Sequence, residues 1–172
     1  KYSCCATAKL YKRDVFGSVR FPIGKLSEDL AVCHLILNNA HRIIYTDEIG
    51  YYYRQRNNSI MHSFNPKRLD ALEWAHDIEI FCKDKYPSIV DAAICRTFNV
   101  AIHLFLDLPR HGELHKVYSK LLWQDIKRTR RRVMFNSKAR KRERIVALLS
   151  FFGKSILFMS WHSGLAVKRK HA

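Results

Sequence analysis

The sequence predicts an α/β segment at residues 1–64, followed by a mostly α-helical extension at residues 65–172. β-Branched and aromatic residues cluster between residues 42 and 53, a composition that favours strands. From residue 66 onward, apolar residues recur at three- and four-residue steps, which is the period of a helix. The 172 residues, 48% of them hydrophobic, provide enough material for one core and an appendage.

In the first segment, residues 1–26 are expected to form loops and a short helix around a sheet edge. A helix is expected from Glu28 to Asn39, with Ser27 as its N-cap. Glu28 and Asp29 then lie in the first turn, where the helix dipole favours negative charge. Two short strands, Arg42–Tyr45 and Ile49–Tyr53, are expected to follow.

The second segment shows three long amphipathic patterns. Helices are expected at Pro66–Tyr86, Ser88–Leu108 and Gly112–Phe135. The stretch from Lys138 to Trp161 joins a basic run to an apolar one. No apolar run reaches the roughly 18 to 20 residues of a membrane-spanning helix, so the chain is not expected to cross a membrane.

The five cysteines show neither a CxxC pair nor the spacing of a zinc site: Cys4, Cys5, Cys33, Cys82 and Cys95. We expect them to be reduced and mostly buried. The nine histidines are scattered, and the one pair at helical spacing, His111 and His115, lacks a third ligand. The sequence therefore predicts no metal site in this chain.

The net charge of +16 is concentrated at the end of the chain. Residues 109–172 carry seventeen Lys and Arg against three Asp and Glu, a balance of +14. Such a tail is attracted to polyanions, either an anionic membrane surface or nucleic acid. The basic run is followed by aromatic and aliphatic residues rather than interleaved with them, which fits a helix lying on an anionic cytoplasmic leaflet. The alternative is a solvated basic helix face with an ordinary apolar core face.

Three short patterns occur in a fixed order in the first half of the chain. They are Lys9-Leu10-Tyr11-Lys12-Arg13, then Arg20-Phe21-Pro22-Ile23-Gly24 with Glu28-Asp29 behind it, and then the run from Tyr51 to Ile60. Together they resemble family-2 glycosyltransferases that build bacterial capsular polysaccharides and exopolysaccharides. The resemblance covers roughly residues 5 to 75 and implies the acceptor-side part of a GT-A, Rossmann-like catalytic domain.

This resemblance also implies a mechanism. The amino-terminal half of such enzymes binds the nucleotide sugar and a divalent cation, Mg or Mn, through a DxD motif, and that motif does not occur in this chain. The acidic pair at the helix start would supply the general base, because an inverting transfer needs a carboxylate that removes the proton of the acceptor hydroxyl. Asp29 is the predicted catalytic residue, with Glu28 as its alternate or orienting neighbour. A purely structural role of both carboxylates at the helix N-terminus is the alternative.

Four further residues are predicted to bind substrate: Arg54, Gln55, Arg56 and Ser59. They follow the second expected strand, where planar guanidinium groups are suited to a leaving diphosphate or to a phosphate on the acceptor. The alternative is a pair of solvent-facing arginines at a strand end.

The sequence thus predicts part of an enzyme that transfers a sugar from a nucleotide-diphosphate sugar to a saccharide or lipid-linked acceptor. The expected location is the cytoplasm, peripheral at the inner face of the cell membrane. Because the nucleotide-binding half is expected to lie outside these residues, this chain alone is expected to be inactive. The alternative function is a non-catalytic basic helical module that binds an anionic membrane or nucleic acid. Nucleic acid is the less favoured partner, because the chain carries no zinc-finger spacing or RNP-like strand.

Overall fold

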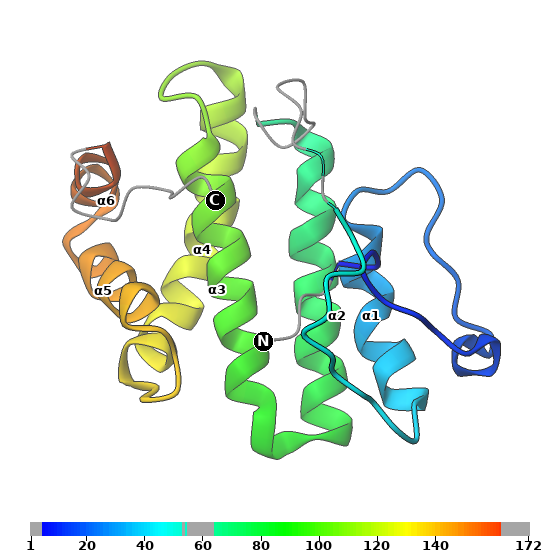
Figure 1. Cartoon of the computed structure of the whole chain (residues 1–172). Coiled ribbons are helices and arrows are strands. Elements are labelled where there is room, and N and C mark those ends of the chain that lie inside the picture. The colour runs from blue at the N-terminus through cyan, green and yellow to red at the C-terminus, as the bar shows by residue number, and fades with distance from the viewer. Residues whose placement is uncertain (1–4, 53, 55–63, 163–172) are drawn as a thin grey trace. The chain divides into compact units, whose positions relative to one another are not determined.

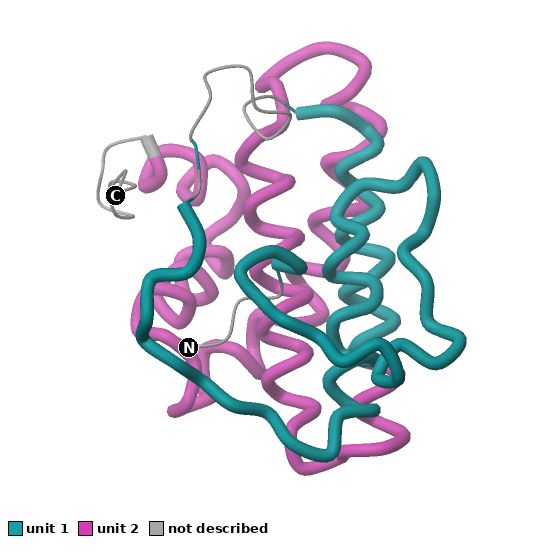
Figure 2. Tube along the Cα trace, turned by 45° about the vertical axis from the view of Figure 1, so that its right-hand side comes forward, with its two compact units in different colours: residues 1–78 teal, residues 79–172 magenta. Residues whose placement is uncertain are grey.

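The computed structural model describes residues 5–52, 54 and 64–162, and its regular elements are helices (Figure 1). In chain order they are the 3-10 helix η1 (Arg13–Phe16), α1 (Glu28–Asn39), η3 (Pro66–Leu69), α2 (Asp70–Lys85), η4 (Pro87–Ile89), α3 (Val90–Asp107), α4 (Glu113–Phe135), α5 (Lys141–Leu149), η5 (Ser150–Phe152) and α6 (Lys154–His162). The chain divides into two compact units, Lys1–Ile78 and Glu79–Ala172, with the boundary inside α2 (Figure 2).

The α/β fold predicted for residues 1–64 is wrong. None of the described residues of the first unit lies in a strand, so the Rossmann-like, GT-A assignment is contradicted as well. The expected strands at 42–45 and 49–53 are irregular where described, and their side chains are exposed, with Ile44 at 71% and Tyr52 at 87%. β-Branched and aromatic residues favour a strand only when a neighbouring strand takes up the backbone hydrogen bonds, and a two-stranded pair alone is marginal in water.

Helix α1 begins at Glu28 and ends at Asn39, as the sequence predicts. Its buried residues, Leu30, Val32, Cys33 and Ile36, lie on one broad face of the helix.

The second unit has a helical core in which α3 packs along α4 and α4 contacts α5 (Figure 1). The helical patterns predicted from residues 66, 88 and 112 all correspond to helices, with a 3-10 turn at the start of the first two. The most buried large side chains of this core are Phe98, Phe105, Leu122, Ile126 and Leu157. Phe105 is fully buried, and its ring centroid lies 5.3 Å from that of Trp123 and 4.9 Å from that of Phe158.

The segment Pro87–Asp107, which comprises η4 and α3, is long and apolar enough to cross a membrane by length and composition. Half of its most apolar stretch is buried inside the structure, and core helices of soluble proteins can be equally long and apolar. The expectation that the chain does not cross a membrane stays a prediction.

None of the cysteines in the described residues forms a disulfide, and Cys33, Cys82 and Cys95 are buried. The expected burial is confirmed for these three, Cys5 is partly exposed, and Cys4 lies outside the described residues. The functional boundary predicted at residue 64 is also untested, because the division of the chain at residue 78 describes compactness and not activity.

His34, on α1, is a half-buried titratable group of the first unit. Burial lowers the pKa of His34, although a hydrogen bond with the backbone of Leu30 and the nearby Asp77 carboxylate act in the opposite direction. Its folded pKa therefore lies below the value of about 6.5 that an unfolded chain shows.

Stability is expected to fall on acidification because of His34. Below about pH 6.5, His34 binds a proton in the unfolded chain but not yet in the folded chain. The free energy of unfolding therefore decreases as the pH falls from about 6.5 toward the folded pKa of His34. The His34→Leu variant should lose part of this dependence. Thermal unfolding of both proteins at pH 7.5 and pH 5.5 measures the difference, and identical pH slopes would contradict the assignment.

Candidate functional site

The start of α1 is held by side chains of α2. The Leu26 amide donates to Asp70 Oδ2 at 2.9 Å, and Trp74 Nε1 donates to the Leu26 carbonyl at 3.1 Å. Lys25 Nζ lies 3.1 Å from Asp70 Oδ1 and 3.0 Å from Glu73 Oε2. The backbone amide and the backbone carbonyl of Leu26, two residues before α1 begins, are thus both hydrogen-bonded to side chains of α2.

Asp70 is ionised by its surroundings despite partial burial. Burial acts to raise the pKa of Asp70, but the hydrogen bonds from the Leu26 amide and Lys25 act more strongly together, and its pKa is lowered. Ion pairs with an exposed lysine contribute little to stability, so the two bonds to the Leu26 backbone are the main restraint. Residues 44 and 48 positions apart form these bonds, and no local sequence signal predicts them.

Ser27 does not cap α1 in the predicted way. Its backbone is left-handed, with φ of 56°, and its side chain makes no capping hydrogen bond, whereas its carbonyl accepts from the Leu30 amide at 2.9 Å. A side-chain cap requires an extended backbone at that position. Ala8 has a φ of 57°, and such backbone costs roughly 1 kcal/mol or more for a residue with a Cβ. Ala8 lies in the loop before η1, and Ser27 lies directly before α1.

Glu28 and Asp29 occupy the first turn of α1, as predicted. Glu28 is exposed, whereas Asp29 is partly buried and its Oδ1 accepts from the Leu30 amide at 2.7 Å. The second carboxylate oxygen of Asp29 makes no hydrogen bond with another described residue. This geometry fits a carboxylate at a helix N-terminus and leaves one oxygen for a ligand.

Tyr11 lies near Asp29, in the loop that precedes η1. Burial raises the pKa of Tyr11, and the nearby Cys33, Cys5 and Asp29 raise it further. Its hydroxyl donates to the Ala6 carbonyl at 3.4 Å. The phenol therefore stays neutral, close to the carboxylate at the start of α1.

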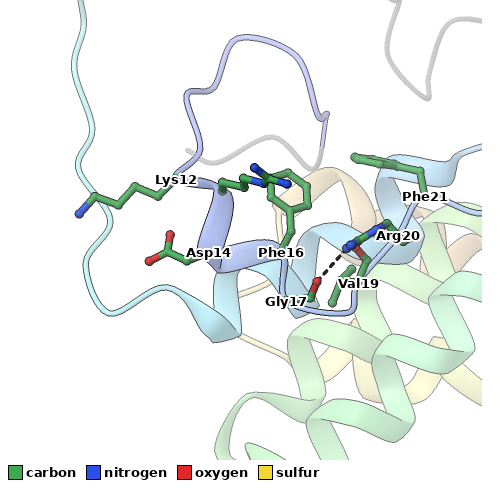
Figure 3. A pocket seen from close by; sticks show the side chains of 8 residues that line it. Lys12, Asp14, Phe16, Gly17, Val19, Arg20 and Phe21 are labelled. Atoms are coloured by element: carbon green, nitrogen blue, oxygen red, sulfur yellow. Dashed lines mark hydrogen bonds between the residues drawn. The ribbon is translucent and has the colours of Figure 1, made fainter.

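An open pocket of about 850 Å³ lies next to this segment (Figure 3). It is lined by Lys12, Arg13, Asp14, Phe16, Gly17, Val19, Arg20 and Phe21. Arg20 lies next to Gly17 and Val19, while Lys12 and Asp14, at the start of η1, point away from Arg20 (Figure 3).

Local contacts give this pocket its shape. Gly17 turns the chain at the end of η1 with φ of 47°, a conformation that glycine adopts readily. Arg20 donates from one terminal nitrogen to the carbonyls of Gly17 and Val19, each at 2.8 Å. Asn39, at the end of α1, donates to the Val15 carbonyl at 3.1 Å. Hydrogen bonds within the turn, and one from Asn39 of α1, thus hold the turn in place.

The pocket combines aromatic rings with three cationic side chains and one acidic side chain. Phe16 contacts the ring of Tyr11 edge-on at a centroid distance of 5.4 Å. Apolar rings bind the hydrophobic faces of a ligand, and guanidinium and ammonium groups bind phosphate. The pocket is therefore chemically suited to a phosphorylated ligand with an apolar face.

The structure places the other predicted site residues as follows. Arg54 is exposed, and Gln55, Arg56 and Ser59 lie outside the described residues. Asp29 and Glu28 do not line the pocket. The catalytic role of Asp29 and Glu28 stays a prediction. So does the substrate-binding role of the other four residues. The described residues hold no group of three or more His, Cys, Asp or Glu side chains able to bind a metal ion.

Sequence reasoning assigned no role to the pocket residues, although two of the three patterns contain half of them. Residues 9–13 and 20–24 flank a short segment that contains Gly17. This glycine, between an aromatic residue and a second basic pattern, is the local signal that predicts a turn and would have identified the pocket.

The chain is similar to a known glycosyltransferase. It is 32% identical over 124 residues to the glycosyltransferase GlyG of Streptococcus pneumoniae serotype 4. The match covers 70% of this chain and 39% of GlyG, so the chain spans about two fifths of the length of that relative. No family model and no solved structure matches the chain. The sequence-based relation to glycosyltransferases is confirmed at this level.

Proposed function

We propose, from this relation to a glycosyltransferase, that the chain forms the acceptor-side part of a family-2 nucleotide-sugar transferase. The whole protein would transfer a sugar from a nucleotide-diphosphate sugar to a saccharide or lipid-linked acceptor during cell-surface polysaccharide synthesis. The observation that carries this proposal is the 32% identity to GlyG over 70% of the chain. The order of the three sequence patterns supports it.

Asp29 is the proposed general base. Its partly buried carboxylate accepts from the Leu30 amide with one oxygen, and the other would accept the proton of an acceptor hydroxyl. Catalysis would then depend mainly on the placement of this oxygen against the acceptor hydroxyl. The bonds from Asp70 and Trp74 to Leu26 support this placement.

The pocket beside Tyr11 is the proposed phosphate-binding part of the site. Lys12, Arg13 and Arg20 supply positive charge for the diphosphate of the donor or a phosphate on the acceptor. Arg54, Gln55, Arg56 and Ser59 are proposed to add donors to the same ligand. A divalent cation, Mg or Mn, is expected to act with the part of the protein outside this chain, because the described residues contain no cluster of candidate ligands.

Replacing Lys12 and Arg13 together by Gln is expected to raise KM about tenfold, equivalent to roughly 1.4 kcal/mol of binding free energy. The value of kcat is expected to change less than about twofold, because cations that hold a phosphate equally in the ground and transition states affect binding alone. The assay follows release of nucleoside diphosphate and of labelled product by the whole protein with a panel of nucleotide sugars.

The matched control removes two exposed cations of the same unit that do not line the pocket, Arg42 and Lys67. The double Gln variant at these positions should keep KM within about twofold of the parent. Equal KM changes in both variants would contradict the phosphate-binding role. Absence of sugar transfer with every nucleotide sugar would contradict the proposed function itself.

A further inference from the structure

The outer face of α5 and η5 is apolar where a helix in water is normally polar. Steps of four, three and four residues place Lys141, Ile145, Leu148 and Phe152 on one face. The three apolar side chains are 53%, 47% and 64% exposed. Single exposed apolar residues are common, but three successive ones on one helical face form a continuous stripe. Helix α6, which follows directly, exposes Ile156 and Met159 as well.

This stripe belongs to a stable part of the second unit. The opposite face of α5 and η5 buries Val146, Ala147 and Ser150. Arg130 donates to the Ser150 carbonyl at 2.7 Å and lies 4.0 Å from the centroid of the Phe151 ring. The three apolar side chains are therefore exposed on a helix whose other face is packed against the core of the second unit.

The second unit carries exposed positive charge, and Lys141 lies on the same face as the stripe. Four exposed cations of α4, the following loop and α5 have no carboxylate within salt-bridge distance among the described residues: Lys127, Arg131, Lys138 and Lys141. Residues 109–172 carry +14 in total. A surface that combines unpaired cations with exposed aliphatic and aromatic side chains matches a bilayer with anionic headgroups, whose phosphates attract the cations while its acyl region takes up the apolar groups. A nucleic acid would offer the charge but no apolar layer.

We propose that this face, defined by Lys141, Ile145, Leu148 and Phe152, docks the protein on an anionic phospholipid bilayer. The inserted groups are Ile145, Leu148 and Phe152, and Lys138 and Lys141, around the start of α5, lie at the headgroups. The inference depends on this surface alone, so it holds or fails independently of the proposed sugar transfer.

The test is co-sedimentation of the whole protein with vesicles of phosphatidylcholine containing about one third phosphatidylglycerol. Leu148→Gln combined with Phe152→Gln should lower the partition coefficient at least about tenfold, because the lost apolar area no longer enters the bilayer. Lys138→Gln combined with Lys141→Gln should lower it about fivefold for each lysine. Pure phosphatidylcholine vesicles should bind the unmodified protein far more weakly.

Matched controls come from α2, within the near-neutral middle of the chain. Ile80→Gln removes a side chain that is 67% exposed, and Lys83→Gln combined with Lys85→Gln removes two exposed cations. Partitioning within about twofold of the parent is expected for both. Equal losses in test and control variants would overturn the proposal. So would tighter binding to single-stranded RNA than to the vesicles, unaffected by Leu148→Gln and Phe152→Gln, because such binding requires charge alone.

Discussion

Replacing Asp29 by Asn in the whole protein is expected to lower the rate of sugar transfer 100- to 10,000-fold, the usual contribution of a general base. The amide oxygen of Asn can still accept from the Leu30 amide, as Asp29 Oδ1 does at 2.7 Å. The variant therefore keeps the geometry of the helix start and loses the proton acceptor. Initial rates at saturating donor and acceptor measure the effect.

The neighbouring carboxylate provides the control. Glu28 is exposed in the same helical turn, and Glu28→Gln should change the rate less than about tenfold. Unfolding of Asp29→Asn should require at most about 1 kcal/mol less free energy than the parent, the usual contribution of a charge at a helix N-terminus. A stability loss of that size with unchanged transfer would assign Asp29 a structural role only. A large rate loss in Glu28→Gln alone would make Glu28 the base.

Replacing Phe105 by Ala is expected to lower the free energy of unfolding of the second unit by about 3 to 5 kcal/mol. The ring is fully buried between Trp123 and Phe158, so its removal leaves a cavity that the surrounding helices fill only in part. Urea unfolding followed by circular dichroism measures the change. A loss of this size is comparable to the entire stability of many small domains.

A second Phe-to-Ala substitution tests whether the loss of stability comes from the burial of the ring or from the loss of any phenylalanine. Phe135, the last residue of α4, is 71% exposed. Its replacement by Ala should change stability by no more than about 0.5 kcal/mol, as is usual for surface positions. Similar effects at the two positions would show that the packing around Phe105 does not determine the stability of this unit.

The helices of this protein could be predicted from the sequence because their signals are local. Apolar residues at three- and four-residue steps repeat within a few turns, and α1 and the helices from α2 to α4 follow these patterns closely. The basic character of the last third is a matter of composition. The acidic pair at the start of α1 was likewise readable from residues 27–29 alone.

The tertiary structure alone decided three other features. The run of β-branched and aromatic residues after α1 has no strand partner among the described residues, and a strand requires hydrogen bonds from another segment. The hydrogen bonds of Leu26 with Asp70 and Trp74 join residues more than 40 positions apart, and the left-handed Ser27 directly follows Leu26. The pocket depends on how the turn at Gly17 lies against the end of α1. Local sequence determined where the helices run, whereas contacts between distant segments determined how the candidate site is built.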